Sequence, residues 1–227
     1  MTASELIILA RYQLGDDQRP YKWSNAELIA YLNSAFWMAC RKAALIRDVS
    51  TTDYCRIPLV TGTYDYALDQ KVISIDQAKI AGQSQPLAKR DSRTFNKYYP
   101  SWRSDGNDLP IEFVTDYKMN YITLRPAPSV TYNGTYLWLE IYRLPTADVT
   151  EATLTTLTPE IKTEYLPYMI DYIMSRAFLK PGQMTFSQFK AQYHAGLWKR
   201  NIDEMLEAEH RLRWEGETIA KLNEGNT

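Results

Sequence analysis

The spacing of apolar residues predicts helices at the two ends of the chain. Apolar positions 6, 9, 10 and 14 share one helical face, with Ser4 as the expected cap and Gly15 as the end. Ser24 and Glu27 form a capping-box pattern that opens a second helix over residues 24–46. Its buried face is expected to carry Leu28, Leu32, Ala35, Phe36, Ala39, Ala43 and Ile46.

The middle of the chain changes to an alternation of apolar and polar residues. β-branched and aromatic residues alternate in short runs that Gly, Pro and Asn interrupt, which predicts a small antiparallel sheet or sandwich. The runs are 55–60, 64–68, 71–76, 110–117, 120–125 and 134–143. In the last run Leu137, Leu139 and Ile141 alternate with Tyr136 and Trp138. Large residues on both faces indicate a strand covered on both sides, and a neighbouring subunit is one candidate cover.

Helical spacing returns after Pro145. Thr158 and Pro159 predict the start of a third helix that runs to about residue 179. Its expected stripe is Ile161, Tyr165, Met169, Tyr172, Ile173 and Ala177. A fourth helix is expected over residues 185–214, with a stripe of Phe186, Phe189, Tyr193, Leu197, Ile202 and Leu206. The polar residues 216–227 predict a flexible C-terminal tail.

These elements together predict an α+β protein. A discontinuous helical bundle is expected from residues 1–48 and 146–215, and a small antiparallel β domain from residues 49–145 is inserted into it. At 227 residues the chain is long enough for a sizeable core in one domain or in two joined ones.

Charge and composition narrow the class of protein. Lys and Arg number 26 against 27 Asp and Glu, so the net charge of −1 argues against a generic polyanion-binding surface. The chain holds 17 Tyr but 9 Gly, which disfavours an enzyme with several Gly-rich phosphate loops. Because tyrosine combines an apolar ring with a polar tip, we interpret its surplus as interface surface.

The cysteines and the hydropathy pattern predict where the protein is made. Cys40 and Cys55 are too few for a disulfide scaffold. The first residues do not resemble a secretory signal, and no run reaches the ~18 apolar residues of a membrane span. We therefore expect synthesis in a reducing cytoplasm and no membrane partner.

The residue pattern contains no signal for catalysis. His194 and His210 have no Cys or carboxylate at metal-ligand spacing, so no metal site is expected. Phosphate-binding and nucleophile motifs are absent from the sequence. Asp203, Glu204 and Glu207 would form acid pairs on a helix, where carboxylates are ordinarily solvated. We expect a protein that is not an enzyme and uses no cofactor.

Residues 89–103 combine five basic residues with four aromatics. The expected contact residues are Lys89, Arg90, Arg93, Lys97, Tyr98, Tyr99, Trp102 and Arg103. Three interpretations are open: an insert that folds onto its own sheet, a contact with a protein, or a site where bases stack and phosphates are neutralised. The near-neutral net charge disfavours the nucleic-acid interpretation.

A second candidate contact lies at the end of the fourth helix and beyond it. Its basic and apolar residues are Arg211, Arg213, Trp214, Ile219 and Leu222. The segment is either a solvated terminus or a segment that becomes ordered on a partner, with the apolar residues as anchors.

Several short motifs occur in an order that resembles a known family. They are WSNAELIAYLNSA at 23–35, DLPIEF at 108–113, LRPAP at 124–128, IYRLP at 141–145, PEI at 159–161 and SRAF at 175–178. Their order resembles the head-to-tail adaptor proteins of tailed bacteriophages, the tail tubular protein A-like group of short-tailed phages. The resemblance extends over residues 6–207.

The resemblance implies a structural virion protein without catalytic activity. Members of that group form a ring of twelve subunits below the portal, bind the tail nozzle or tube on the other side, and leave a channel for genomic DNA. By the same resemblance, the C-terminal segment would contact the portal and residues 89–103 would point toward the tail. The alternatives are a head-completion or neck protein of a long-tailed phage and, from another class, a nucleic-acid-binding module that uses residues 89–103. A tail-associated hydrolase is the remaining class.

Overall fold

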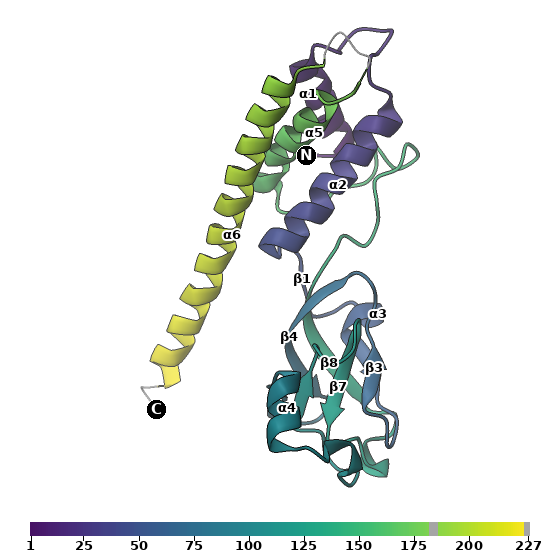
Figure 1. The fold of residues 1–227 in the computed structure, drawn as a ribbon, viewed down its shortest axis with the longest axis vertical. Coiled ribbons are helices and arrows are strands. Elements are labelled where there is room, and N and C mark those ends of the chain that lie inside the picture. Colours follow the sequence, from purple (N-terminus) through teal and green to yellow (C-terminus); the bar gives the residue numbers. More distant parts are fainter. Residues whose placement is uncertain (182–185, 225–227) are drawn as a thin grey trace. The chain divides into compact units, whose positions relative to one another are not determined.

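The chain folds into helices at both ends and antiparallel strands in the middle, which confirms the α+β class (Figure 1). The computed structural model describes residues 1–181 and 186–224, with side chains up to residue 213. Its internal contacts divide into two compact units. We call Met1–Ile46 with Leu144–Thr227 the helical unit, and Arg47–Arg143 the β unit. Whether they behave as separate domains with the predicted boundaries stays a prediction.

The first two helices begin at capping boxes. Helix α1 spans Ala3–Leu14, and its cap is Thr2 rather than the predicted Ser4, because Thr2 and Glu5 bond reciprocally. The predicted box of Ser24 and Glu27 is confirmed at the start of α2, Asn25–Ala43. Helix α2 ends before residue 46 because Ala44 adopts a left-handed conformation with a φ of 50°. That conformation ordinarily takes glycine, so the sequence carries no stop signal there.

The third helix begins later than the sequence predicts. A 3₁₀ segment, η3, spans Thr163–Tyr168, and helix α5 follows over Met169–Ala177. Pro167 lacks the N–H that a regular helix requires at that position, so the α-helix starts after it. Upstream, the Glu160 carboxylate accepts hydrogen bonds from the backbone N–H and the hydroxyl of Thr146, both at 2.6 Å. This contact ties the start of the predicted helix to the connector.

Helix α5 lies at the centre of the helical unit. It packs against α1, α2 and helix α6, Gln188–Glu224. The apolar stripe predicted for the third helix is confirmed, because each of its six residues is at most 6% exposed. Four of them, Met169, Tyr172, Ile173 and Ala177, lie on α5. Helix α6 continues past the predicted end near Trp214, so that predicted bound was wrong.

The β unit contains two four-stranded sheets. The first surrounds β8, Tyr136–Arg143, which pairs antiparallel with β1 (Arg47–Asp48), β2 (Arg56–Pro58) and β4 (Val72–Ile80). The second has the order β3-β7-β6-β5, with β3 at Asp65–Ala67, β7 at Tyr121–Arg125, β6 at Glu112–Val114 and β5 at Ala88–Lys89. Strands β5 and β6 are parallel, an exception to the expected antiparallel pairing.

Short helices connect these strands. They are α3 (Thr52–Cys55), α4 (Ser92–Tyr98), η1 (Trp102–Ser104) and η2 (Val130–Tyr132).

The two sheets share one apolar core. Leu137, Leu139 and Ile141 of β8 are at most 1% exposed and belong to one cluster with Phe113 of β6 and Leu124 of β7. The side of β8 that carries these three residues therefore faces the core. The unit is a small sandwich in which β8 is the central strand of one sheet.

Candidate interaction surfaces

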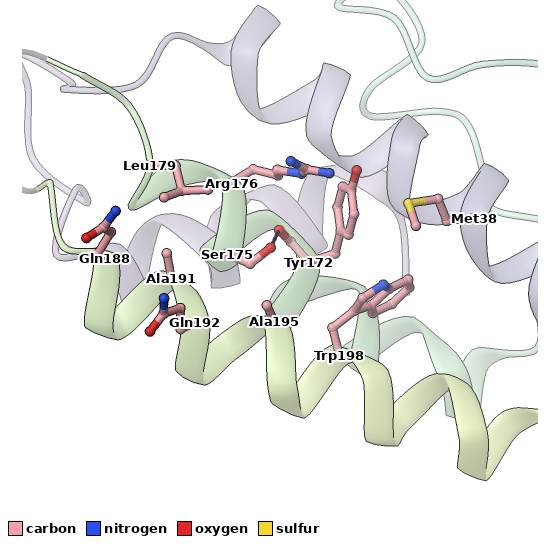
Figure 2. A pocket seen from close by; sticks show the side chains of 10 residues that line it. All are labelled: Met38, Tyr172, Ser175, Arg176, Leu179, Gln188, Ala191, Gln192, Ala195 and Trp198. Atoms are coloured by element: carbon pink, nitrogen blue, oxygen red, sulfur yellow. Dashed lines mark hydrogen bonds between the residues drawn. The ribbon is translucent and has the colours of Figure 1, made fainter.

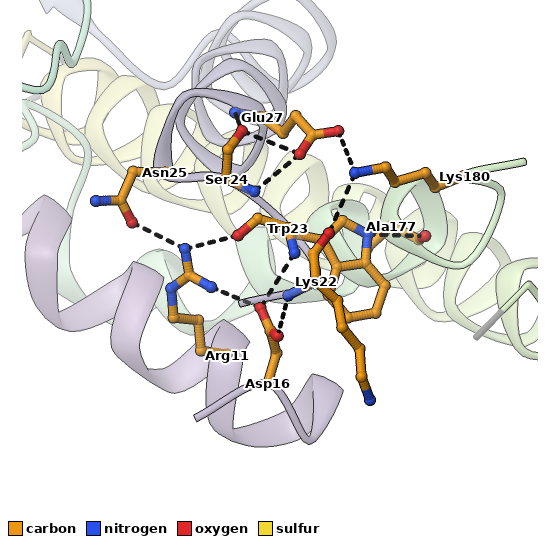
Figure 3. A network of polar contacts seen from close by, with 9 residues as sticks. All are labelled: Arg11, Asp16, Lys22, Trp23, Ser24, Asn25, Glu27, Ala177 and Lys180. Carbon is orange, nitrogen blue, oxygen red and sulfur yellow. Dashed lines mark hydrogen bonds and ion pairs between the residues drawn. The ribbon is translucent and has the colours of Figure 1, made fainter. Parts of the chain in front are cut away.

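A buried polar network fixes the turn between α1 and α2 (Figure 3). The Arg11 guanidinium donates to Asp16 Oδ2 at 2.6 Å, to the Trp23 carbonyl at 2.9 Å and to Asn25 Oδ1 at 2.8 Å. Asp16 also accepts from the backbone N–H groups of Lys22 and Trp23. Both charges are buried and each is hydrogen-bonded several times, as buried charges require.

The same turn is tied to the end of α5. The indole N–H of Trp23 donates to the Ala177 carbonyl at 3.2 Å, and Lys180 pairs with Glu27 at 2.7 Å (Figure 3). The pKa of Glu27 lies below its ordinary value, mainly because the Lys180 ammonium donates a hydrogen bond to this carboxylate. These contacts position α1, α2 and α5 as one rigid scaffold.

A groove of about 390 Å³ opens on this scaffold between α2, α5 and α6 (Figure 2). Its apolar lining includes Met38, Tyr172, Leu179, Ala191, Ala195 and Trp198. Two alanines four residues apart on one face of α6 leave room that larger side chains would fill. Arg176 lies at the groove, with its guanidinium carbon 5.1 Å from the centre of the Tyr172 ring.

The predicted buried stripe of α6 is wrong in its first half. Phe186, Phe189 and Tyr193 are 49%, 81% and 59% exposed. Among the residues of α6 whose side chains the structure describes, the buried ones are Ala191, Trp198, Asn201, Met205 and the correctly predicted Ile202. The helical periodicity predicted that the large aromatics are buried, but the buried position in this part of α6 is occupied by the small Ala191. We call Phe189 and Tyr193 the aromatic row.

Strand β8 presents a second group of exposed aromatics. Trp138 is 42% and Tyr136 is 48% exposed, so the β unit covers this part of the strand only in part. Arg56 and Lys79 lie directly opposite Trp138 on the two neighbouring strands. The Arg56 guanidinium stacks 4.9 Å from the indole centre and donates to the Val49 carbonyl. The expectation of a neighbouring subunit over this face stays a prediction.

The aromatic side chains of residues 89–103 are divided between core and surface. Phe95 and Trp102 are 1% and 3% exposed and pack with Val114 against the second sheet. The Trp102 ring meets Tyr64 and Tyr117 edge-on at 5.6 Å. Trp102, a predicted contact residue, thus belongs to the core of its own unit.

Most basic residues of this segment bind groups of their own chain. Arg90 pairs with Glu112 at 3.2 Å, and Arg103 pairs with Asp65 at 3.1 Å. Lys89 Nζ donates to the Ile75 carbonyl at 2.6 Å. Arg93 and Lys97 are exposed and have no carboxylate partner within the described residues. Carboxylates thus pair with two of the five basic residues, Arg90 and Arg103.

The remaining aromatics of the segment lie at the surface. Tyr98 is 64% exposed, and Tyr99 lies under the Arg125 guanidinium at 3.3 Å. The structure therefore brings Arg93, Lys97 and Tyr98 together on α4 and its end, as exposed groups. A contact of this segment with a tail protein stays a prediction.

The predicted C-terminal contact residues lie on α6. Arg211 is exposed, whereas Arg213 donates to the Ala44 carbonyl at the end of α2 at 3.2 Å. A cation there interacts favourably with the helix dipole. The side chains of Trp214, Ile219 and Leu222 lie outside the described residues. The flexibility of residues 216–227 also stays a prediction.

The strongly shifted titratable groups are structural. Burial alone would raise the pKa of Asp48, but hydrogen bonds from Thr51 and Arg143 hold it well below its usual range. Burial, followed by the Asp48 charge, raises the pKa of Cys55 to about 11. Burial and the neighbouring Glu209 likewise raise the pKa of Tyr165.

The acid pairs and histidines considered in the sequence show no catalytic arrangement. Asp203, Glu204 and Glu207 are all exposed, as solvated carboxylates are. His194 Nδ1 lies 2.9 Å from Asp171, whereas His210 is exposed.

Among the residues that the structure describes, no group of three His, Cys, Asp or Glu side chains could hold a metal ion. Over the same residues, no helix has the length and apolar character to cross a membrane.

Residues 1–219 match the family model described as SU10 adaptor protein. No curated protein matches the chain.

Proposed function

Since the chain belongs to the SU10 adaptor protein family, a family of structural phage adaptors, we propose that it is a ring subunit that joins the portal to the tail of a short-tailed bacteriophage. The family match over residues 1–219 carries this proposal. In this role the protein is part of the virion, uses no cofactor and catalyses no reaction. The ring has twelve subunits and surrounds the path of the genomic DNA.

The distribution of exposed aromatics supports a protein with several partners. A ring subunit presents two different faces to its neighbours, and an adaptor needs further surfaces for the portal and the tail. Exposed aromatic residues occur on α6, on β8 and on α4, in both units. Large obligate contacts are rich in such residues.

The charge of the chain supports passage of DNA without tight binding. The net charge is −1, and two of the five basic residues of segment 89–103 pair with Glu112 and Asp65. Weak phosphate contacts keep the cost of sliding low. The same pairing weakens the case for a nucleic-acid-binding module.

The end of α6 is the proposed portal contact, and residues 89–103 are the proposed tail contact. The long helix supports the first assignment because it carries the exposed Arg211 and continues to Glu224. Arg93, Lys97 and Tyr98 support the second because they are exposed on a short, well-anchored helix.

Electron microscopy of the virion, or of the protein bound to its portal, tests the proposal. We expect a twelve-fold ring between portal and tail. A ring in the neck of a long-tailed particle would support the alternative structural role, and a peripheral or absent density would refute both. Deleting residues 216–227 should abolish portal binding, and unchanged binding would show that the portal contact lies elsewhere.

A further inference from the structure

Helix α6 carries two apolar surfaces on different faces. One side contributes Ala191 and Ala195 to the groove, and another side carries the aromatic row of Phe189 and Tyr193. Phe189 and Ala195 are six residues apart, which at about 100° per residue places them roughly 120° apart around the helix. A straight helix cannot fold its own row into its own groove. Phe189, 81% exposed, and Tyr193, one turn further along, are therefore available for contact with another molecule.

We infer that the aromatic row of one copy packs into the groove of a second copy, forming the contact between neighbouring ring subunits. This inference rests on the proposed function and assigns residues to its subunit interface. The groove volume of about 390 Å³ accepts an aromatic side chain, since pockets for small molecules start at about 300 Å³. Its apolar floor includes Met38 and Trp198 (Figure 2).

The exposed charges along α6 support the same pairing. Arg200 lies eleven residues after Phe189 of the aromatic row. Asp203 likewise lies eleven residues after Gln192, which lines the groove. An eleven-residue spacing returns to the same face of a helix. When two parallel copies of α6 bring Phe189 level with Gln192, Arg200 of one copy meets Asp203 of the other. Both residues are exposed, and Arg200 has only a long 3.8 Å contact with Glu204.

The pairing also has the symmetry that a ring requires. In a two-fold dimer each copy would bury both its row and its groove in the same contact, whereas in a ring the row of one copy meets the groove of the next. This head-to-tail contact leaves one row and one groove free at the ends of every open assembly. It closes only when the last copy meets the first.

Mixed disulfides test the contact in the full chain. One tagged chain carries Phe189→Cys and a second carries Ala195→Cys, and the two are mixed under a mild copper oxidant. The natural Cys40 and Cys55 are buried at 0% exposure and do not compete. A disulfide requires Cα atoms within about 7 Å. The matched control pairs Ala195→Cys with Met119→Cys, because Met119 is an 86% exposed apolar residue of the β unit.

We expect roughly tenfold more mixed disulfide from the Phe189 pair than from the control, because docking raises the effective concentration of the two thiols. Equal yields would overturn the inference. Charge reversal gives an independent readout by sedimentation. Arg200→Asp should weaken self-association, and adding Asp203→Arg should restore it. The double variant does not restore the contact between residue 200 and Glu204 within the helix, so that contact cannot account for the rescue. Failure of this rescue would also count against the pairing.

The outcome is separable from that of the proposed function. A ring seen by microscopy without the Phe189 disulfide would refute only the assigned interface. The disulfide in a protein absent from the head–tail junction would refute only the proposed function.

Discussion

Breaking the buried ion pair between Arg11 and Asp16 should destabilise the helical unit. In Arg11→Met the aliphatic part of the side chain is kept, but the Asp16 carboxylate loses its cation while only 1% of its side chain is exposed. The Trp23 carbonyl and Asn25 lose a donor as well. Removing one partner of a buried pair costs about 3–5 kcal/mol. We expect the lower end, about 3 kcal/mol, because Asp16 keeps two backbone N–H donors.

Urea unfolding followed by helical circular dichroism measures this loss. The matched control is Arg200→Met, which removes an exposed pair of 3.8 Å with Glu204 and should change the free energy of unfolding by less than about 0.5 kcal/mol. Hydrogen exchange should show the loss first in α1 and in the turn that follows it. If Arg11→Met cost no more than the control, the network would not brace these helices.

Three further predictions concern the β unit. The pKa of Asp48 is held below its ordinary value of 3.8, so the stability that this carboxylate contributes is present above pH 3.8 and is lost as the pH falls further. Asp48→Asn should therefore reduce the loss of stability in acid, as measured by unfolding at a series of pH values. Phe95→Ala should cost about 3–5 kcal/mol in urea unfolding, whereas Tyr98→Ala on the same helix should change it by less than about 0.5 kcal/mol. Cys55 is buried and its pKa is raised to about 11, so it should react with a thiol reagent far more slowly in the native protein than in urea. Equal reaction rates would contradict its burial.

The elements that the sequence identified are those with local signals. The box of Ser24 and Glu27 involves residues within one turn, and the alternation of Leu137 and Leu139 follows from the strand itself. The end of α2 at Ala44 has no such signal, because its left-handed residue is not a glycine. Element types were thus predictable wherever the determinant lay within a few residues.

The candidate contact surfaces were harder to predict because they depend on partners distant in the chain. Periodicity places Phe189 in a buried stripe, yet the core position on α6 goes to the smaller Ala191. Likewise, residues 89–103 are basic when the segment is considered alone. In the structure, Arg90 and Arg103 pair with Glu112 and Asp65, which lie outside the segment. The groove combines three helices and has no motif of its own.

The tyrosine surplus has two explanations rather than one. Seven of the 17 tyrosines are more than a third exposed: Tyr12, Tyr21, Tyr98, Tyr99, Tyr117, Tyr136 and Tyr193. Four of these lie against a cation of their own chain, as Tyr21 does with Arg11 at 3.9 Å and Tyr99 with Arg125 at 3.3 Å. Three of these rings cover arginines of their own chain, whereas Tyr98 lies beside the exposed Lys97.

Three exposed tyrosines have no such cation among the described residues. They lie on three separate elements, Tyr12 on α1, Tyr136 on β8 and Tyr193 on α6. Interpreting every tyrosine as interface would therefore overestimate the contact surface, and the uncovered rings are the better candidates. Tyr193 belongs to the aromatic row, so the lack of such a cation among the described residues adds to its 59% exposure as a reason to expect a partner at this face.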